Sequence, residues 1–416
     1  MGLVDLDFKK VLERYNDEPS WLSNSRLFSL ENLSKFELPK LEKTTIATWN
    51  FKDFDFLSNK NFSFHKEQDF LNNKSDLLKN DFLQVNGRTI SKNSTFGKGV
   101  ILEDFLVSCS NYSELVKEYF EQFAITNKLA ALHSSFLNGG VFLYVPKNVE
   151  IKEPVSVLFF FKGQKVAFSP RILIVVEENS KVDFVCKFYS EEENLFNNGV
   201  VQLFLKENAK ATFTSLNMFP KNTIDVISSC SYLSNKSELD FYLTNLSQGQ
   251  VIFKNEVYLT GDYSKANIDA LTFGTFQHEG NFTTAVYHEK RNTKSNINAR
   301  AVVKEEARTV LNSITHIKKG AKQSDGKQKS KVLMVSKQAR GDANPILLID
   351  ENDVIAGHAA SVGKLDPMQL FYLMSRGLTQ RVAEKLLIFG FIQEVFSKIK
   401  IEGIKSNILD YIDKLI

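Results

Sequence analysis

From Gly140 onward, short apolar runs alternate with turn residues, a pattern typical of β-strands. The runs are rich in β-branched and aromatic side chains, and none is long enough for a helix of usual length. Clear examples are 141–145, 155–161, 172–176, 200–205 and 251–259. No helical pattern interrupts this part of the chain before the C-terminal region. The pattern therefore predicts a long region made of strands.

These strands recur at a nearly constant spacing. The first inward-type apolar residues of successive strands are Val182, Ala211, Leu239 and Ala266, which gives intervals of 29, 28 and 27 residues, and Ile297 continues the series. A repeat of this length indicates stacked supersecondary units. We therefore expect a β-solenoid, in which each coil buries one face against its neighbours. Two tandem immunoglobulin-like sandwiches of about 100 residues each are the alternative.

The chain before this region shows helical patterns separated by polar stretches. Apolar residues recur at helical spacing over 4–15 and again over 113–123. Between them, 50–95 is dense in Asn, Lys, Asp and Ser without a sustained period, so we expect loop with some strand there. Residues 1–138 are therefore interpreted as an N-terminal helical region with polar loops.

Helical signals return near the C-terminus. Asp366 can cap a helix that begins at Pro367, with Gln369 at its third position. A second helix is expected to start at Thr379, and a third carries apolar residues on one face of 404–415. The predicted protein is therefore mainly β, with a β-helix core over 139–362 and a C-terminal helical domain over 363–416.

Composition and charge exclude several classes of function. Lys and Arg total 52 against 49 Asp and Glu, and the formal charge of +3 gives no reason to expect nucleic acid as a partner. The lysines between 318 and 331 lack interleaved aromatic residues, so we interpret them as a solvated, mobile loop. The apolar runs 157–161 and 386–392 are far shorter than the ~20 residues that cross a membrane. The acidic N-terminus resembles neither a secretory signal nor a lipid anchor, so we expect a cytoplasmic protein.

The sequence shows no local metal centre and no nucleophile motif. Cys109, Cys186 and Cys230 are too far apart for a metal knuckle or a disulfide framework, and we interpret them as small core residues in a reducing compartment. The 6 histidines lack the HxH or HxxxH spacing of zinc sites. Residues 320–328 do not form a phosphate-binding P-loop, and 359–363 lack the first Gly of a nucleophile elbow. These absences argue against ATPase and hydrolase activity.

Phenylalanine is over-represented, with 35 Phe against 2 Trp. A stacked solenoid interior can accommodate such a bias, because Phe is flat and has no polar atom that needs a partner. The expected members of a stacked ladder are Phe160, Phe184, Phe213, Phe241 and Phe273. A general bias of the proteome explains the excess equally well.

Four segments near the C-terminus carry a recognisable pattern. They are 320–325 (GAKQSD), 339–345 (ARGDANP), 353–366 (DVIAGHAASVGKLD) and 370–377 (LFYLMSRG). In order and spacing they resemble the SufB/SufD family of iron-sulfur cluster assembly proteins, and the third segment resembles the SufD type. Weaker similarity at 138–146 and 18–21 extends the resemblance over most of the chain.

The resemblance implies a right-handed parallel β-helix and the role of a non-catalytic scaffold subunit. Such a subunit pairs with a SufB-type subunit through the β-helix and docks a SufC-type ATPase through its C-terminal helical region. ATP-driven movement then rearranges the interface at which a nascent cluster is built. The resemblance implies that this chain alone holds no stably bound cofactor. It implies a transient iron-sulfur cluster or iron at that interface. Whether the isolated chain forms a homodimer, or binds iron or flavin, stays open.

One histidine is the implied metal ligand. His358 matches the family's histidine at the interface with SufB, where an imidazole nitrogen can bind iron. Judged without the family, it is an ordinary structural or surface histidine. Ala356 offers no thiolate and no cysteine lies beyond Cys230, so most cluster ligands are expected to come from the partner.

The helix after Asp366 is the implied ATPase-binding element. Its Phe371, Tyr372 and Arg376 are residue types that suit an interface hot spot, and packing against the following helix is the alternative. From the solenoid pattern alone, a carbohydrate-active or carbohydrate-binding β-helix protein is a second reading. Its weakness is that no motif places a catalytic pair of carboxylates.

Overall fold

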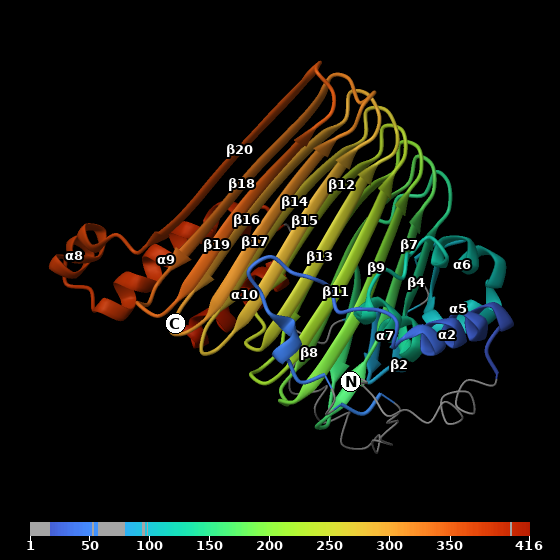
Figure 1. Ribbon diagram of the computed structural model, residues 1–416, viewed down its shortest axis with the longest axis horizontal. Helices are drawn as coiled ribbons and strands as arrows, with labels where there is room; N and C mark the ends of the chain where they lie inside the picture. Colours follow the sequence, from blue (N-terminus) through green and yellow to red (C-terminus); the bar gives the residue numbers. More distant parts are fainter. Residues whose placement is uncertain (1–16, 52–53, 57–79, 94–95, 98, 400–401) are drawn as a thin grey trace.

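A computed structural model describes residues 17–51, 54–56, 80–93, 96–97, 99–399 and 402–416. The helix expected over 4–15 lies outside the described residues. Helices cover parts of a long core made of strands (Figure 1), so the prediction of a mainly β protein with helical flanks is confirmed.

The core is a parallel β-solenoid built from two sheets. Sheet I runs in the order β2 (Arg88–Lys92), β1 (Phe82–Val85), β5 (Val155–Phe161), β8 (Lys181–Ser190), β10 (Lys210–Met218), β12 (Glu238–Asn245), β14 (Lys265–Gly274), β16 (Lys294–Val303), β18 (Ser324–Met334) and β20 (Val354–Lys364). Sheet II runs β19 (Arg340–Ile349), β17 (Arg308–Ile317), β15 (Glu279–His288), β13 (Gln250–Leu259), β11 (Ile224–Leu233), β9 (Leu195–Leu205), β7 (Pro170–Val176), β4 (Gly139–Val145) and β3 (Ile101–Asp104), and β6 (Val166–Phe168) pairs with β9. From β7 onward, successive strands alternate between the sheets, so each coil adds one strand to each. The alternative of two tandem immunoglobulin-like sandwiches is therefore wrong.

The register confirms most of the predicted period. Val182, Ala211, Leu239 and Ala266 lie side by side on successive strands. The next residue in this row is Ser295, and Ile297 pairs with Ile268 instead, so the proposed end of the series is displaced by two residues. The polar Ser295 hid the true position because the sequence reading followed apolar residues.

Asparagine marks one row of turns between the sheets. Asn148, Asn179 and Asn208 have φ between 56° and 61°, a left-handed conformation that Asn tolerates better than most residues. Their side chains form a ladder in which Asn179 Nδ2 donates to Asn148 Oδ1 at 3.0 Å and Asn208 Nδ2 donates to Asn179 Oδ1 at 2.8 Å. The repeated Asn therefore adopts the left-handed backbone conformation of these turns, and its side chain forms hydrogen bonds between neighbouring coils.

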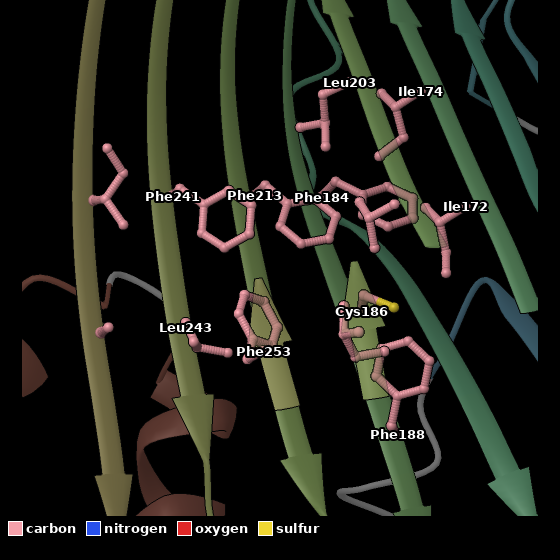
Figure 2. Close-up of a cluster of buried hydrophobic side chains, with 14 of the residues drawn as sticks. Ile172, Ile174, Phe184, Cys186, Phe188, Leu203, Phe213, Phe241, Leu243 and Phe253 are labelled. Atoms are coloured by element: carbon pink, nitrogen blue, oxygen red, sulfur yellow. The ribbon is translucent and has the colours of Figure 1, made fainter. Parts of the chain in front are cut away.

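Part of the predicted Phe ladder exists inside the solenoid. Phe184, Phe213 and Phe241 lie on neighbouring strands with ring centroids 5.7 Å and 4.9 Å apart, and Figure 2 shows them abreast. Phe160 and Phe273 are not members, because both side chains point to the outer face of sheet I. A single-residue change in position along a strand reverses the face, so spacing alone misassigned these two.

The second half of the lysine-rich stretch is a strand and not a loop, whereas Lys318, Lys319 and Lys322 lie in the turn between β17 and β18. Lys327, Lys329 and Lys331 lie on β18, where they alternate with the buried Gln328 and Ser330. Strand pairing with β16 and β20 on both sides explains this order. The expected loop with some strand at 50–95 does contain β1 and β2.

Helices cover the outer faces of the two sheets. On sheet II lie α2 (Ser20–Asn32), the 3-10 helix η1 (Ile46–Thr48), α5 (Phe105–Asn111), α6 (Ser113–Phe120) and α7 (Lys128–Phe136), and α6 confirms the helix expected over 113–123. On sheet I lie α9 (Gln380–Phe396) and α10 (Glu402–Leu415). The remaining helix, α8 (Pro367–Ser375), projects away from the solenoid (Figure 1). Among the described residues, no helix is long and apolar enough to span a membrane.

Candidate functional site

The solenoid ends in an uncovered coil. Among the described residues, β20 and β19 are the last strands of sheets I and II, so each has a hydrogen-bonded neighbour strand on one side only. Every residue of β20 after Val354 is exposed. Apolar side chains of this coil also face solvent, including Ile355 at 63 % exposure, Val362 at 44 % and Leu348 at 45 %. An edge with free backbone groups beside exposed apolar residues is suited to pairing with another chain.

His358 lies in the middle of this edge. It is in register with Gln328 of β18, whose side chain is buried and donates from Nε2 to Thr315 Oγ1 at 2.7 Å. Its neighbours on the same face of β20 are the small residues Ala356 and Ala360, and His358 is exposed. The imidazole is therefore open to a group that approaches the last coil.

The described residues do not form a complete metal site around His358. Among them, no group of three or more His, Cys, Asp and Glu side chains is arranged to hold a metal ion. His358 could thus supply one ligand to a metal whose other ligands come from elsewhere. An imidazole nitrogen is a suitable donor for iron.

The cysteines are poor candidates for cluster ligands in this conformation. Cys109, Cys186 and Cys230 are all buried free thiols, in agreement with the sequence interpretation as core residues. Burial raises the pKa of Cys109 and of Cys230 to about 12, and it raises the pKa of Cys186 as well. Since the thiolate is the form that binds metal, these protonated thiols are inert at neutral pH.

The helix α8 carries the second candidate site. Asp366 Oδ1 accepts hydrogen bonds from the backbone N–H of Met368 at 2.8 Å, and the helix begins at Pro367 as expected. The helix ends before Gly377, which has the φ of 91° that favours glycine. Local sequence signals therefore define both ends of α8 without help from tertiary packing.

The predicted docking residues lie exposed on α8. No residue of this helix is buried, and the exposed fractions of Phe371 and Tyr372 are 67 % and 56 %. The guanidinium of Arg376 lies 5.2 Å from the centre of the Tyr372 ring, within reach of a cation–π interaction. Two large aromatic side chains in water are unusual for a free surface. The alternative, burial of these residues against the following helix, is wrong.

The helix that follows, α9, is anchored to sheet I by charged groups that the sequence reading missed. The carboxylate of Glu394 pairs with Arg300 of β16 and with Lys329 of β18, whose Nζ lies 2.9 Å from Glu394 Oε1. The hydrogen bond from Lys329 is the main cause that lowers the pKa of Glu394. Arg300 also donates to the carbonyl of Phe391. These contacts connect α9 to the strands beside the open coil.

A buried ion pair adds a further anchor for the chain after α9. Lys398 Nζ lies 2.8 Å from Oδ1 of Asp269 on β14, which is only 1 % exposed. Burial raises the pKa of Asp269 in spite of this cation, so the pair is partly desolvated. One signal could have revealed the anchors. Asp269 and Arg300 are charged residues beside the outward apolar residues Leu271 and Val302, which marks a covered sheet face.

Comparison with known proteins agrees with this architecture. The family described as SUF system FeS cluster assembly, SufBD core domain, matches residues 159–391, and the SufBD protein N-terminal region matches 11–157. The iron-sulfur cluster assembly protein SufD of Bacillus subtilis is 33 % identical over 99 % of this chain and 98 % of its own length. A SufBD family protein of Staphylococcus saprophyticus is 23 % identical over 96 % of this chain and 90 % of its own. The chain therefore belongs to the SufB/SufD family of iron-sulfur cluster assembly proteins, as a member of the SufD type.

Proposed function

We propose that the chain is a non-catalytic scaffold subunit that pairs with a SufB-type subunit through β19 and β20 and docks a SufC-type ATPase through α8. The observation that carries this proposal is the uncovered last coil, in which β20 is exposed along nearly its whole length. Membership in the SufD type supplies the context of cluster assembly. The buried free cysteines suit a reducing compartment, and we place the work of the complex in the cytoplasm.

Pairing through the open coil would complete what the solenoid lacks. A second β-solenoid whose last coil meets β19 or β20 would supply hydrogen-bond partners to the edge strands. It would also cover Ile355, Val362 and Leu348, three exposed apolar side chains of the last coil. A SufB-type subunit is the partner expected for this surface, and a second copy of the chain is the expected competitor when that subunit is absent.

In this arrangement His358 faces the partner. The proposed role is to donate one imidazole nitrogen to iron or to a nascent iron-sulfur cluster, which is the cargo of the complex and not a resident cofactor. The partner would supply most of the remaining ligands, since the chain's own three cysteines are buried and protonated.

Docking of the ATPase would use the exposed face of α8. The aromatic side chains of Phe371 and Tyr372 can bury a large area while few rotatable bonds become fixed. The guanidinium of Arg376 can pair with a carboxylate of the partner. The anchors of α9 suggest how a movement of the docked ATPase would reach the solenoid. Glu394 of α9 is paired with residues of β16 and β18, and β18 is the direct neighbour of β20. A displacement of α8 and α9 would therefore act on the strands next to the proposed cluster interface.

Co-expression with SufB-type and SufC-type partners tests both surfaces. We expect one complex that contains all three chains by native mass spectrometry. Ile355→Lys with Val362→Lys should release the SufB-type subunit and retain the ATPase, whereas Phe371→Ala with Tyr372→Ala should do the reverse. Phe28→Ala is the matched control, because Phe28 is 55 % exposed on α2, away from both surfaces. Retention of both partners by both double variants would refute the assignment of the surfaces.

The solenoid alone also fitted a carbohydrate-active or carbohydrate-binding β-helix protein. Membership in the SufB/SufD family accounts for the solenoid without that activity. Cleavage of a polysaccharide by the isolated chain would restore this alternative.

A further inference from the structure

A groove of about 800 Å³ lies away from both surfaces of the proposed function. One wall consists of the turns that lead from sheet I into the sheet II strands β11, β13, β15 and β17. The other wall is the segment around η1, which contributes Thr48, Asn50 and Phe54. The groove crosses the stacked coils, so its long direction is the axis of the solenoid.

Its two ends carry opposite charges. Lys165 lies at the N-terminal end, and Glu305 and Glu306 lie at the C-terminal end. Lys221 lies between them, with its ammonium over the ring of Phe276. Backbone hydrogen bonds show that the turns stack one per coil, from Lys165 N to Asn194 O at 2.8 Å up to Glu306 N to Phe276 O at 3.0 Å. At ~4.8 Å per coil the distance from the first lysine to the glutamates is about 24 Å, which an extended chain of about seven residues would span.

Between the charged ends, the lining is rich in carboxamides. Asn194, Asn222, Gln250 and Gln277 all line the groove. A carboxamide can donate and accept hydrogen bonds at the same time, and so can the peptide group of an extended chain. The middle of the groove therefore suits a ligand with alternating donors and acceptors.

An aromatic residue stands in a conformation that suits asparagine better. Phe276 has a φ of 57°, and the same position of other turns in this row holds Lys165, Asn194, Asn222 and Glu305, all with positive φ. The backbone N–H of Phe276 donates to Glu305 Oε2 at 2.8 Å, and Lys221 Nζ lies 3.3 Å from the centre of its ring. The residue remains 36 % exposed, so part of its side chain is open to a ligand in the groove.

We infer that this groove binds an extended peptide segment of a partner protein, with acidic side chains at the end near Lys165 and basic side chains at the end near Glu305. Phe276 provides the apolar contact in the middle of the segment. An oligosaccharide would match the carboxamides and the aromatic ring, but a neutral sugar chain has no use for two ends of opposite charge. This inference does not depend on the SufB-type or ATPase contacts proposed above.

A phage-displayed library of random 12-residue peptides, selected on the full-length chain, tests the inference. Enriched peptides should carry acidic residues at one end and basic residues at the other. Their Kd should rise at least tenfold in Phe276→Asn and in Lys165→Glu. A peptide whose acidic end is replaced by lysines should bind Lys165→Glu better than it binds the unmodified chain.

The controls distinguish binding from folding. Tyr263→Asn is the matched control, because Tyr263 is also an exposed aromatic residue with positive φ but lies in another row of turns. Both Asn variants should raise the Tm, since each relieves a left-handed aromatic residue, but only Phe276→Asn should weaken binding. Peptides that bind all variants equally would overturn the inference. So would a library without enrichment, or a neutral oligosaccharide that binds in a Phe276-dependent way.

Discussion

The two ends of the solenoid are finished in different ways. At the N-terminal end, β2 and β3 pair antiparallel to their neighbours and break the parallel stack. Lys92 of β2 and Glu103 of β3 form an ion pair at 2.7 Å that joins the two sheets there. At the C-terminal end, β19 and β20 continue the parallel stack and then stop, with apolar side chains exposed. Stacked repeats need caps to stay soluble alone, so the uncapped end is the one at which we propose that a partner binds.

The interior and the open coil should differ most in their contribution to stability. Phe213 stacks between Phe184 and Phe241 and is 1 % exposed. We expect Phe213→Ala to lower the free energy of unfolding by ~3–5 kcal/mol, because it leaves a cavity in a packed core. Ile355→Ala at the open coil should lower it by less than ~0.5 kcal/mol. Guanidinium denaturation of the isolated chain measures both, and similar losses would contradict the contrast.

The buried histidines of the interior should make the stability of the fold depend on pH. His288 is buried with its ring nitrogens 2.8 Å from the hydroxyls of Thr293 and Ser295, and burial lowers its pKa from 6.5 to about 4. Because the folded pKa lies below the unfolded one, its stabilising contribution is present above pH 6.5 and is lost as the pH falls toward 4.

A variant at His288 tests this. His288→Gln should reduce the loss of unfolding free energy between pH 7 and pH 4 by ~3 kcal/mol, the value of a shift of this size. Denaturation curves at several pH values measure this, and an unchanged dependence in His288→Gln would show that the buried histidine is not the sensor. His278 is buried with a similar shift and should account for a further part of the acid loss.

The anchor of the C-terminal helices should have an intermediate effect. Lys398→Met leaves the buried carboxylate of Asp269 with Asn298 as its remaining side-chain donor. We expect a loss of ~1–3 kcal/mol in unfolding free energy, since a buried charge then lacks its counter-ion. Lys181→Met, which removes an exposed pair with Glu150, is the control and should change little. Equal effects in a denaturation experiment would argue that α9 and α10 are held by apolar contacts alone.

The smallest effect on stability is expected at His358, the residue proposed to bind iron or the nascent cluster. His358→Ala removes an exposed side chain at the open coil, so the unfolding free energy should change by less than ~0.5 kcal/mol. In the complex reconstituted with SufB-type and SufC-type subunits, iron and sulfide content should fall. Chemical assay of both elements checks this, with Ser361→Ala on the same strand as control. Normal loading in His358→Ala would remove this residue from the site and leave the scaffold proposal intact.

Repeats and local helix signals made much of the fold predictable. The spacing from Val182 to Ala266 reports the coil length directly, because in-register parallel strands place equivalent residues side by side. Asp366 and Pro367 defined the start of α8, since capping depends on neighbours in sequence. The exposure of Phe371 and Tyr372 was not predictable in this way. Their apolar pattern is the same whether a helix packs on its own chain or binds a partner chain.

The amino-acid sequence by itself determined the β-solenoid, its period, the capped helix after the last coil and the kinship with SufD-type proteins. Only the tertiary structure decided that Phe160 and Phe273 point outward, that Lys327 to Lys331 form a strand, and that Arg300 and Lys398 anchor the C-terminal helices. It also decided that the last coil is left open around His358. The reason is physical: local patterns report the conformation of a segment, whereas burial, ion pairing and exposure depend on residues that only folding brings together.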